Sequence, residues 1–321
     1  MTGHLIIEKI ITYYGDKNTE YHWISEGFQN IMIKCTHQSR TIFVRATESN
    51  RRPLDMLQAE IDWLFTLSKA TLHVPTALPS HHGNIIEKIF VEETPYYLVA
   101  FHEIAGEPLD VTNKKIWNTL LFQEWGATLG RIHRTTPNKT LYRPNQWEAS
   151  LTVIETINYF TLNENEEMNV RLQEMVDEIS KLPTDSEVFG LIHNDFHQGN
   201  IIMHPQGIGV IDFDDCMYCW YAQDFSVALY HAYWQATEIA GLDSSFSTTF
   251  LDSFIQGYEK SYPLSPDTIK QIPLFVRWRE FFLYALFKKK WPLHALQDWQ
   301  SFTLEKLRNR ILTGETYIPI V

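Results

Sequence analysis

The sequence predicts an α+β fold with two lobes, a small β-rich N-lobe followed by a larger and mainly helical C-lobe. Three observations lead to this expectation. The length of 321 residues exceeds that of one small domain. Short β-branched runs separated by turn residues dominate the first hundred residues, and long segments with helical periodicity dominate the rest. We therefore expect lobes at 1–100 and 107–321, joined by a connector at 101–106.

The N-lobe is expected to contain strands and one helix. Two β-branched runs, "IMIKC" and "TIFVRAT", are separated by the polar segment "THQS", which is typical of a hairpin. The segment "RPLDMLQAEIDWLFTLSKA" predicts a helix, because Leu57, Ile61 and Leu64 recur at helical spacing and Pro53 suits the first turn. A second strand pair, "NIIEKIF" and "PYYLVAF", is predicted around "VEET".

The C-lobe is expected to be helical apart from one hairpin. Helices are predicted for "KIWNTLLFQEWGATLGRIHR", for most of 148–181, and for the aromatic-rich chain from "AQDFSVAL" onward. Among them lies "LIHNDFHQGNIIMHPQGIGVIDFDD", residues 191–215, in which Pro205, Gln206 and Gly207 have the chemistry of a turn between two apolar runs.

Composition restricts the classes of function. Hydrophobic residues make up 44%, and 27 basic residues against 39 acidic ones give a net charge of −12, which disfavours a nucleic-acid partner and suits cationic small molecules. A low, odd count of three cysteines indicates a reducing compartment, and "CMYC" is expected to be structural or incidental. The start "MTGHLIIEKII" lacks the features of a signal peptide, and no apolar run reaches the roughly 18 residues of a membrane helix. We expect a cytoplasmic protein without a membrane partner.

The polar residues of 191–215 are expected to converge. If the hairpin is centred on Gln206, antiparallel pairing brings Asn200 opposite Asp212 on one face of the hairpin. Asp195 lies on the loop that leads into the first strand. Carboxylate and amide oxygens are hard ligands, so this arrangement predicts a site that suits Mg²⁺.

Two motifs in this stretch carry a resemblance to a known family. "HNDFHQGN" fits H-x-D-x-x-x-x-N, and "IDFDD" follows after a short hairpin. The pair resembles the catalytic loop and metal-binding aspartate of the aminoglycoside phosphotransferase and choline kinase family. Further segments agree in order over roughly residues 20–235: "SEGFQN", "FVRAT", "AEIDWL", "YYLVAFHEIAGEPL", "GATLGRIH" and "AQDFSVAL".

The resemblance implies a protein-kinase-like fold and a function. The protein would transfer the γ-phosphate of ATP, with Mg²⁺, to a hydroxyl of a small molecule. The acceptor is expected to carry an amine, because the chain is acidic and acids such as Asp214, Asp215, Glu259 and Glu280 fall in or after the metal motif. Aminoglycosides, choline-like alcohols and amino-acid alcohols such as homoserine fit this description equally.

The resemblance also assigns roles within the catalytic stretch. Asp195 would orient the attacking hydroxyl or accept its proton, and Asn200 and Asp212 would hold Mg²⁺. Asp214 would reach a second metal or orient the loop. His193 is expected to brace the loop, and Asp224 is expected to cap a helix or brace the same loop. His197 and His204 are expected to be solvated or structural.

Nucleotide contacts are expected from two parts of the N-lobe and from the connector. Arg45 stands where kinases keep a lysine, and its guanidinium can grip phosphate oxygens while Glu60 pairs with it; Asp62 should point elsewhere on the helix. "SEGFQN" has one glycine, so donors to the phosphates from Ser25, Gly27 and Asn30 compete with the interpretation as a plain turn. The hinge is expected to offer adenine its backbone groups at Phe101, Glu103 and Ile104.

The resemblance implies that the acceptor pocket lies downstream of the metal motif, where aromatic residues are frequent. Aromatic faces attract ammonium groups, although packing of large side chains between helices explains the same residues. The candidates are Asp215, Tyr218, Trp220 and Trp278.

Three alternatives to a small-molecule kinase remain open. The triplet H-x-D-x-H of His193, Asp195 and His197 is compatible with a metallohydrolase that binds Zn²⁺ or Mn²⁺. Arg45 and the glycine-poor loop are compatible with a kinase homologue that binds nucleotide without turnover. A protein Ser/Thr kinase of related fold would keep the chemistry and change the acceptor.

Overall fold

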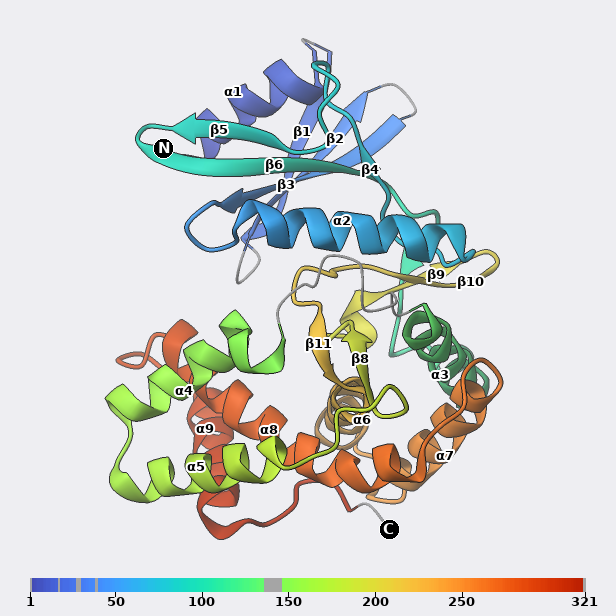
Figure 1. Ribbon diagram of the computed structural model, residues 1–321, viewed down its shortest axis with the longest axis vertical. Coiled ribbons are helices and arrows are strands. Elements are labelled where there is room, and N and C mark those ends of the chain that lie inside the picture. The colour runs from blue at the N-terminus through green and yellow to red at the C-terminus, as the bar shows by residue number, and fades with distance from the viewer. Residues whose placement is uncertain (1, 17, 27–29, 38–39, 136–145, 320–321) are drawn as a thin grey trace. The chain divides into compact units, whose positions relative to one another are not determined.

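The computed structural model describes residues 2–16, 18–26, 30–37, 40–135 and 146–319 (Figure 1). The chain forms two compact units, Met1–Glu107 with His204–Asp214, and Pro108–Met203 with Asp215–Val321. The first unit is rich in strands and the second is mainly helical, as the sequence predicted. The units divide after Glu107 rather than at 101–106, and 204–214, expected in the C-lobe, group with the first unit.

A sheet with antiparallel pairing forms the centre of the first unit. Its order is β1-β2-β3-β6-β4, and β5 also pairs with β6. The β2–β3 and β5–β6 pairs are the two predicted hairpins. The strands are β1 (Glu20–Glu26), β2 (Ile31–His37), β3 (Arg40–Glu48), β4 (Ala77–Leu78), β5 (Glu87–Val91) and β6 (Thr94–His102).

Helix α1 (Thr2–Tyr14) packs its apolar face on this sheet. Ile6 and Ile10 are one helical turn apart and fully buried, and they share a core with Val44 of β3. The expectation of a single helix in this lobe was therefore wrong. The run "LIIEKII" is rich in isoleucine, a β-branched residue with lower helical propensity than leucine or alanine. The helical spacing of its buried residues was therefore not recognised in the sequence.

Helix α2 (Leu54–Lys69) covers the other face of the sheet. Because side chains alternate along a strand, Arg45 points away from the face of Val44 and reaches Glu60 on α2. Leu57, Ile61 and Leu64 are buried as predicted, and Pro53 is the N-cap residue rather than part of the first turn. This packing brings an acid and a base together inside the unit.

In the second unit, helices lie on both sides of a short antiparallel strand pair, β8 (Phe189–Ile192) with β11 (Met217–Trp220) (Figure 1). The turn predicted near Gln206 is present at Pro205 and Gln206, between β9 (Ile201–His204) and β10 (Gly207–Val210). The boundary between the two units falls within the short strand β7 (Glu107–Pro108). The remaining elements are α3 (Thr119–Arg134), η1 (Trp147–Ala149), α4 (Leu151–Asn163), α5 (Glu166–Ser180), η2 (Gln198–Asn200), α6 (Tyr221–Trp234), η3 (Gln235–Ile239), α7 (Phe246–Glu259), α8 (Pro266–Lys290) and α9 (Asp298–Thr313).

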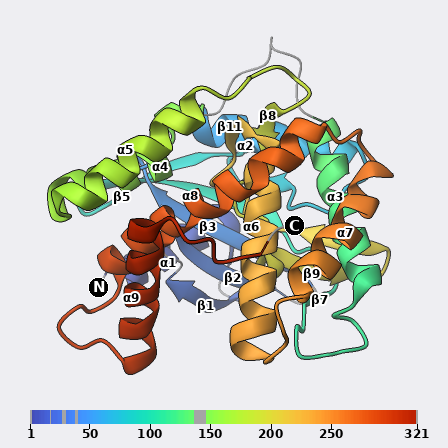
Figure 2. The same ribbon diagram turned by 90° about the horizontal axis from the view of Figure 1, so that it is seen from below.

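Helices α3 and α7 lie side by side at close range (Figures 1 and 2). A Cβ atom at Gly126 of α3 would overlap the backbone carbonyl oxygen of Phe254 on α7. A Cβ atom at Gly257 of α7 would likewise overlap the carbonyl oxygen of Gln123. Glycine at these two positions therefore permits the close approach of the two backbones.

Across the described residues, none of the helices combines the length and apolar character that crossing a bilayer requires.

Candidate active site

A buried carboxylate accepts hydrogen bonds from the backbone of the loop that follows β8. Asp224, in the first turn of α6, accepts hydrogen bonds from the backbone amides of His193 at 2.9 Å and Asn194 at 2.6 Å. It also lies 3.1 Å from Nε2 of the buried His133. Burial lowers the pKa of His133, against the opposing effect of Asp224. The contacts of Asp224 are those of a residue that braces the loop.

Within the loop, His193 and Asn194 shape the backbone before Asp195. His193 is fully buried, and its Nδ1 accepts the backbone amide of Asp195 at 3.2 Å. Asn194 adopts a left-handed backbone conformation with φ 71°, and its side-chain amide donates to the backbone carbonyl of Asp215 at 3.2 Å. A positive φ at a residue other than glycine is uncommon and costs conformational energy, which is typical of functional loops.

The carboxylate of Asp195, on the loop after β8, lies close to two basic side chains. Its Oδ1 accepts a hydrogen bond from the Arg279 guanidinium at 2.8 Å, and its Oδ2 lies 3.4 Å from Nε2 of His197. Burial by itself would raise the pKa of this carboxyl, but His197, Arg279 and His231 together hold the pKa well below its usual range. The carboxylate is still about a quarter exposed, so a ligand can reach it.

Asn200 lies against the same residue. Its side-chain nitrogen donates to the backbone oxygen of Asp195 at 2.8 Å and lies 3.4 Å from Oδ2. Because the amide nitrogen is engaged there, the amide oxygen is the atom that Asn200 can offer to a cation.

Arg279 is a site residue that the sequence analysis missed. It lies on α8, 84 positions from Asp195, and is 5% exposed. Its Nη2 and Nε lie 2.7 Å and 3.2 Å from Nε2 of His231 on α6. The ring of His231 stacks on His197 with centroids 4.7 Å apart. No local pattern links these positions, because only the packing of α6 and α8 brings them to the loop. His197, expected to be solvated or structural, is also part of this group.

In the first unit, the predicted pair of Arg45 and Glu60 is present and buried. The guanidinium forms two hydrogen bonds with the carboxylate, at 2.9 Å and 2.7 Å. Arg52, which the sequence analysis missed, donates to the same carboxylate at 3.0 Å. Burial alone would lower the pKa of Arg45, but Glu60, with Asp214 and Asp212, raises it. Asp62 accepts instead from Gln58 at 2.9 Å.

The aspartates of "IDFDD" lie in the same unit as Arg45. Asp214 is buried and accepts a hydrogen bond from the Asn30 side chain at 2.6 Å. Burial would raise its pKa, but Arg52 and Arg45 lower it. These contacts favour the loop-orienting role over the second-metal role. Asp212 is exposed and has a left-handed backbone with φ 68°, a second conformational outlier among the motif residues.

The expected nucleotide segments are described in part. Gly27 and the side chain of Ser25 lie outside the described residues. Phe101 is buried at the end of β6, and the Arg45 guanidinium lies 5.2 Å from its ring centroid. Glu103 forms an ion pair with Lys34 at 3.2 Å, and Ile104 is half-buried. Their backbone contacts with a nucleotide stay a prediction.

Two of the expected acceptor residues are packed in the interior of the second unit. Trp220 and Trp278 are 4% and 2% exposed, and both contact the ring of Trp147 edge to face. Tyr218 is also buried, whereas Asp215 is half-buried. The tryptophans therefore stabilise the unit and present little surface to a ligand.

The two acids of the later helices that were expected to favour an amine-bearing acceptor differ in exposure. Glu280 is buried and accepts a hydrogen bond from Arg310 at 2.5 Å, so its carboxylate is not free to bind an amine. Glu259 is exposed at the end of α7.

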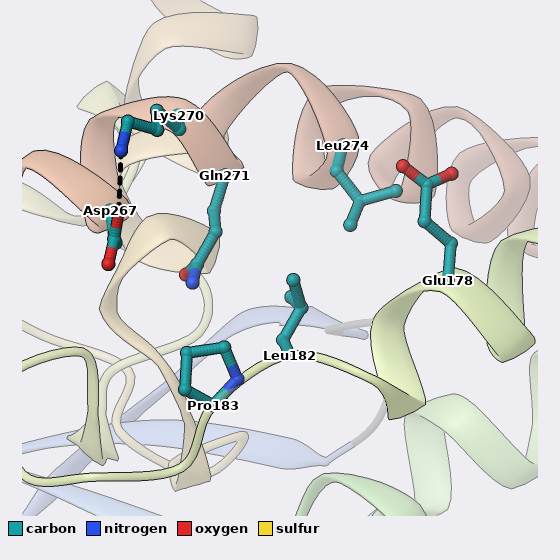
Figure 3. A pocket seen from close by; sticks show the side chains of 7 residues that line it. All are labelled: Glu178, Leu182, Pro183, Asp267, Lys270, Gln271 and Leu274. Atoms are coloured by element: carbon teal, nitrogen blue, oxygen red, sulfur yellow. Dashed lines mark hydrogen bonds and ion pairs between the residues drawn. The ribbon is translucent and has the colours of Figure 1, made fainter.

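A cavity of about 270 Å³ lies elsewhere in the second unit, between the end of α5, the segment after it and the first turns of α8 (Figure 3). Leu182, Pro183 and Gln271 line it, and the Asp267–Lys270 ion pair at 2.7 Å lies at its rim. It contains none of the residues that the sequence predicted for the site.

The sequence profile of the phosphotransferase enzyme family matches residues 21–266, which include Arg45, Asp195 and Asp212. The chain belongs to the phosphotransferase enzyme family. The resemblance noted from the two motifs is thereby confirmed.

The chain is similar in sequence and in structure to several named kinases. Amicoumacin kinase of Bacillus subtilis (strain 168) is 24% identical over 314 residues, which cover 96% of this chain and 92% of that protein. A solved amicoumacin kinase, described as a complex with AMP-PNP, Ca²⁺ and Ami, has a TM-score of 0.87 at 24% identity, over 99% of this chain and 95% of that one. A microcompartment-associated aminopropanol kinase has a TM-score of 0.75 at 19% identity, over 96% and 97%. These likenesses confirm the kinase-like fold.

Asp195 and Asn200 belong to the second unit, whereas Arg45, Glu60 and Asp212 belong to the first. The convergence of Asn200 with Asp212 therefore stays a prediction.

Proposed function

We propose that this phosphotransferase moves the γ-phosphate of ATP, with a divalent cation such as Mg²⁺, to a hydroxyl of a small molecule that carries an amine. Family membership supports the reaction class. The main support from the site is Asp195, a partly exposed carboxylate held in one orientation by Arg279 and His197 on the family's catalytic loop. Phosphoryl transfer has a loose transition state, so an oriented carboxylate matters more than a strong base.

The roles of the other residues follow from their chemistry. Arg45, steadied by Glu60, would bind phosphate oxygens with its remaining donor capacity. The exposed carboxylate of Asp212 and the amide oxygen of Asn200 are hard donors that fit Mg²⁺, which would neutralise charge on the phosphates when bound. Asp214 would orient the loop that contains Asp212. His193 and Asp224 would brace the loop that contains Asp195. Backbone groups near Phe101, Glu103 and Ile104 would bind adenine.

The acceptor class is supported by charge and by the relatives. The chain carries 39 acids against 27 basic residues, which favours a cationic ligand. Relatives of similar fold are named as kinases of amicoumacin and aminopropanol and as a phosphotransferase of spectinomycin. A small amino alcohol or an amino sugar would combine the hydroxyl that reacts with an amine that orients it.

The alternatives are less well supported. In a metallohydrolase, His193 and His197 would both serve as ligands, but the Nδ1 of each accepts a backbone amide and Asp195 pairs with Arg279. Family membership favours phosphoryl transfer instead. A protein acceptor, or nucleotide binding without turnover, would each give a distinct result in the experiment that follows.

A substrate panel tests the proposal. Purified protein is incubated with Mg-ATP and with amino alcohols, amino sugars and neutral analogues that lack the amine, and phosphorylated products are detected by mass spectrometry. We expect the amines to be phosphorylated with higher kcat/KM than their neutral analogues. Nucleotide binding without a product would favour the homologue without turnover, and phosphorylation of a protein substrate alone would favour the protein kinase.

Asp195→Asn tests the central residue with the acceptor found in that panel. The amide keeps the size of the side chain and removes its charge, so we expect turnover to fall by about 10²–10⁴-fold. Nucleotide affinity, measured by calorimetry, should remain because Asp195 is not assigned to the nucleotide. Near-normal turnover in the variant would contradict the assignment.

A further inference from the structure

Arg279 is unusual because it is a buried cation that shares its donors between two site residues. One guanidinium nitrogen donates to Asp195 Oδ1 at 2.8 Å and also lies 2.7 Å from His231 Nε2. The Nε donates to the same imidazole nitrogen at 3.2 Å. The face of the guanidinium lies 4.9 Å from the centroid of the Phe282 ring. Contacts on three sides fix the direction of the donor that meets Asp195.

The two oxygens of Asp195 are consequently not equivalent. Oδ1 is committed to a charged, buried donor, whose hydrogen bond is among the stronger kinds in proteins. Oδ2 meets His197 and Asn200 only at the longer distance of 3.4 Å. An incoming hydroxyl therefore finds Oδ2 as the oxygen with spare accepting capacity, at an angle that Arg279 sets.

His231 completes the arrangement as an acceptor behind Arg279. Its Nε2 faces two donors of the guanidinium, so this nitrogen accepts and the proton of the neutral ring resides on Nδ1. The side chains that face the imidazole are Arg279 from α8, His197 from η2 and Asp195 from the loop. Burial, Arg279 and His197 lower the pKa of His231 well below its usual range, which keeps the acceptor form.

We propose that Arg279 is a positioning residue for phosphoryl transfer, which fixes the Asp195 carboxylate so that Oδ2 receives the acceptor hydroxyl. The proposal rests on the proposed function. Arg279 bonds with one oxygen and leaves the other to the substrate, so its loss should affect the reacting geometry more than binding. A purely structural tie between α8 and the loop would instead affect stability and leave the rate per folded molecule unchanged.

Arg279→Ala tests this with Arg277→Ala as the matched control. Arg277 lies on the same helix and pairs with Glu178 at 2.9 Å, away from the loop. We expect kcat of Arg279→Ala to fall by about 10²-fold, the loss typical of a misplaced reacting group, with KM for the acceptor and nucleotide affinity unchanged. Arg277→Ala should retain the wild-type kcat.

Chemical rescue separates positioning from folding. Guanidinium at a non-denaturing concentration can enter the space left by the side chain, so it should raise kcat of Arg279→Ala, with sodium chloride at equal ionic strength as reference. It should not rescue Asp195→Asn. Arg279→Lys, which keeps the charge without the planar fork, should fall between wild type and alanine. A folded Arg279→Ala with wild-type kcat would overturn the proposal.

A crystal structure of Arg279→Ala provides a readout that does not depend on turnover. We expect the Asp195 carboxylate to leave the orientation in which Oδ1 faces α8. Retention of that orientation would overturn the positioning role whatever the activity of the wild type. Failure of the wild type to phosphorylate any acceptor would overturn the proposed function, and these two results can be told apart.

Discussion

At the scale of single residues, Glu60 holds two buried guanidiniums in place. Arg45 and Arg52 both donate to its carboxylate, and all three residues are buried. We expect Glu60→Gln to lower the free energy of unfolding by about 3–5 kcal/mol, because it removes the charge of the carboxylate to which two buried guanidiniums are hydrogen-bonded. Urea denaturation measures the change.

Asp62→Asn is the control for Glu60→Gln. Asp62 lies on the same helix, is exposed and accepts one hydrogen bond from Gln58. Its replacement should change stability by less than about 0.5 kcal/mol. Equal effects of the two substitutions would mean that the buried arginines find other partners and that Glu60 does not hold them.

Sequence reasoning found residues whose partners are set by local structure. Arg45 and Glu60 lie 15 positions apart on a strand and the helix that follows, so their pairing could be predicted. Arg279 and His231 could not, because α8 and α6 are remote from Asp195 in the sequence and only tertiary packing joins them. Arg52 was missed because it precedes the helix, where no periodicity points to a face.

At the scale of elements, the close packing of α3 on α7 depends on glycine. Gly126→Ala in an exposed helix would stabilise it by about 1 kcal/mol through higher helical propensity. Here the new Cβ would overlap the carbonyl oxygen of Phe254, so the helices must separate. We expect a net loss of about 1–3 kcal/mol, measured by urea denaturation.

Leu120→Ala is a suitable control on the same helix, because Leu120 is 73% exposed. It should be nearly neutral. A Gly126→Ala variant more stable than the wild type would mean that propensity outweighs the overlap and that α3 and α7 adjust freely.

The same contrast between local and tertiary signals explains which elements were predicted. The two hairpins of the first unit have turn residues between β-branched runs and were predicted correctly. Helix α1 was missed because its isoleucines favour strands locally, and only the core that it shares with Val44 stabilises the helix. Trp220 and Trp278 were candidates for the acceptor pocket, with packing between helices as the alternative, and their contact with Trp147 explains their burial.

At the scale of the whole molecule, the order of the motifs predicted the kinase-like fold. The order of hairpins, helix, connector and catalytic stretch is a long-range pattern that survives in the sequence. The stretch 191–215, in which the site was predicted, contributes to both units, with Asp195 in one and Asp212 in the other. The geometry between them depends on the placement of two units, which no spacing within the sequence determines.

The pH dependence of folding provides a prediction at this scale. Burial raises the pKa of Glu280 from its ordinary value of 4.5 to about 7, against the opposing effect of Arg310. The folded protein therefore binds a proton that the unfolded chain releases above pH 4.5. The contribution of Glu280 to stability is fully present below pH 4.5 and is lost as the pH rises to about 7. A shift of one pKa unit corresponds to about 1.4 kcal/mol, so the loss is on the order of 3 kcal/mol.

Glu280→Gln should remove this dependence, because the amide stays neutral at every pH. Urea denaturation of both proteins across the interval from pH 4.5 to 8 should give a variant that gains stability relative to the wild type as the pH rises. Glu305→Gln, an exposed change on α9, should leave the wild-type slope intact. Identical slopes for wild type and Glu280→Gln would mean that Glu280 stays ionised beside Arg310 throughout, and that this buried pair, rather than a neutral acid, joins α8 to α9.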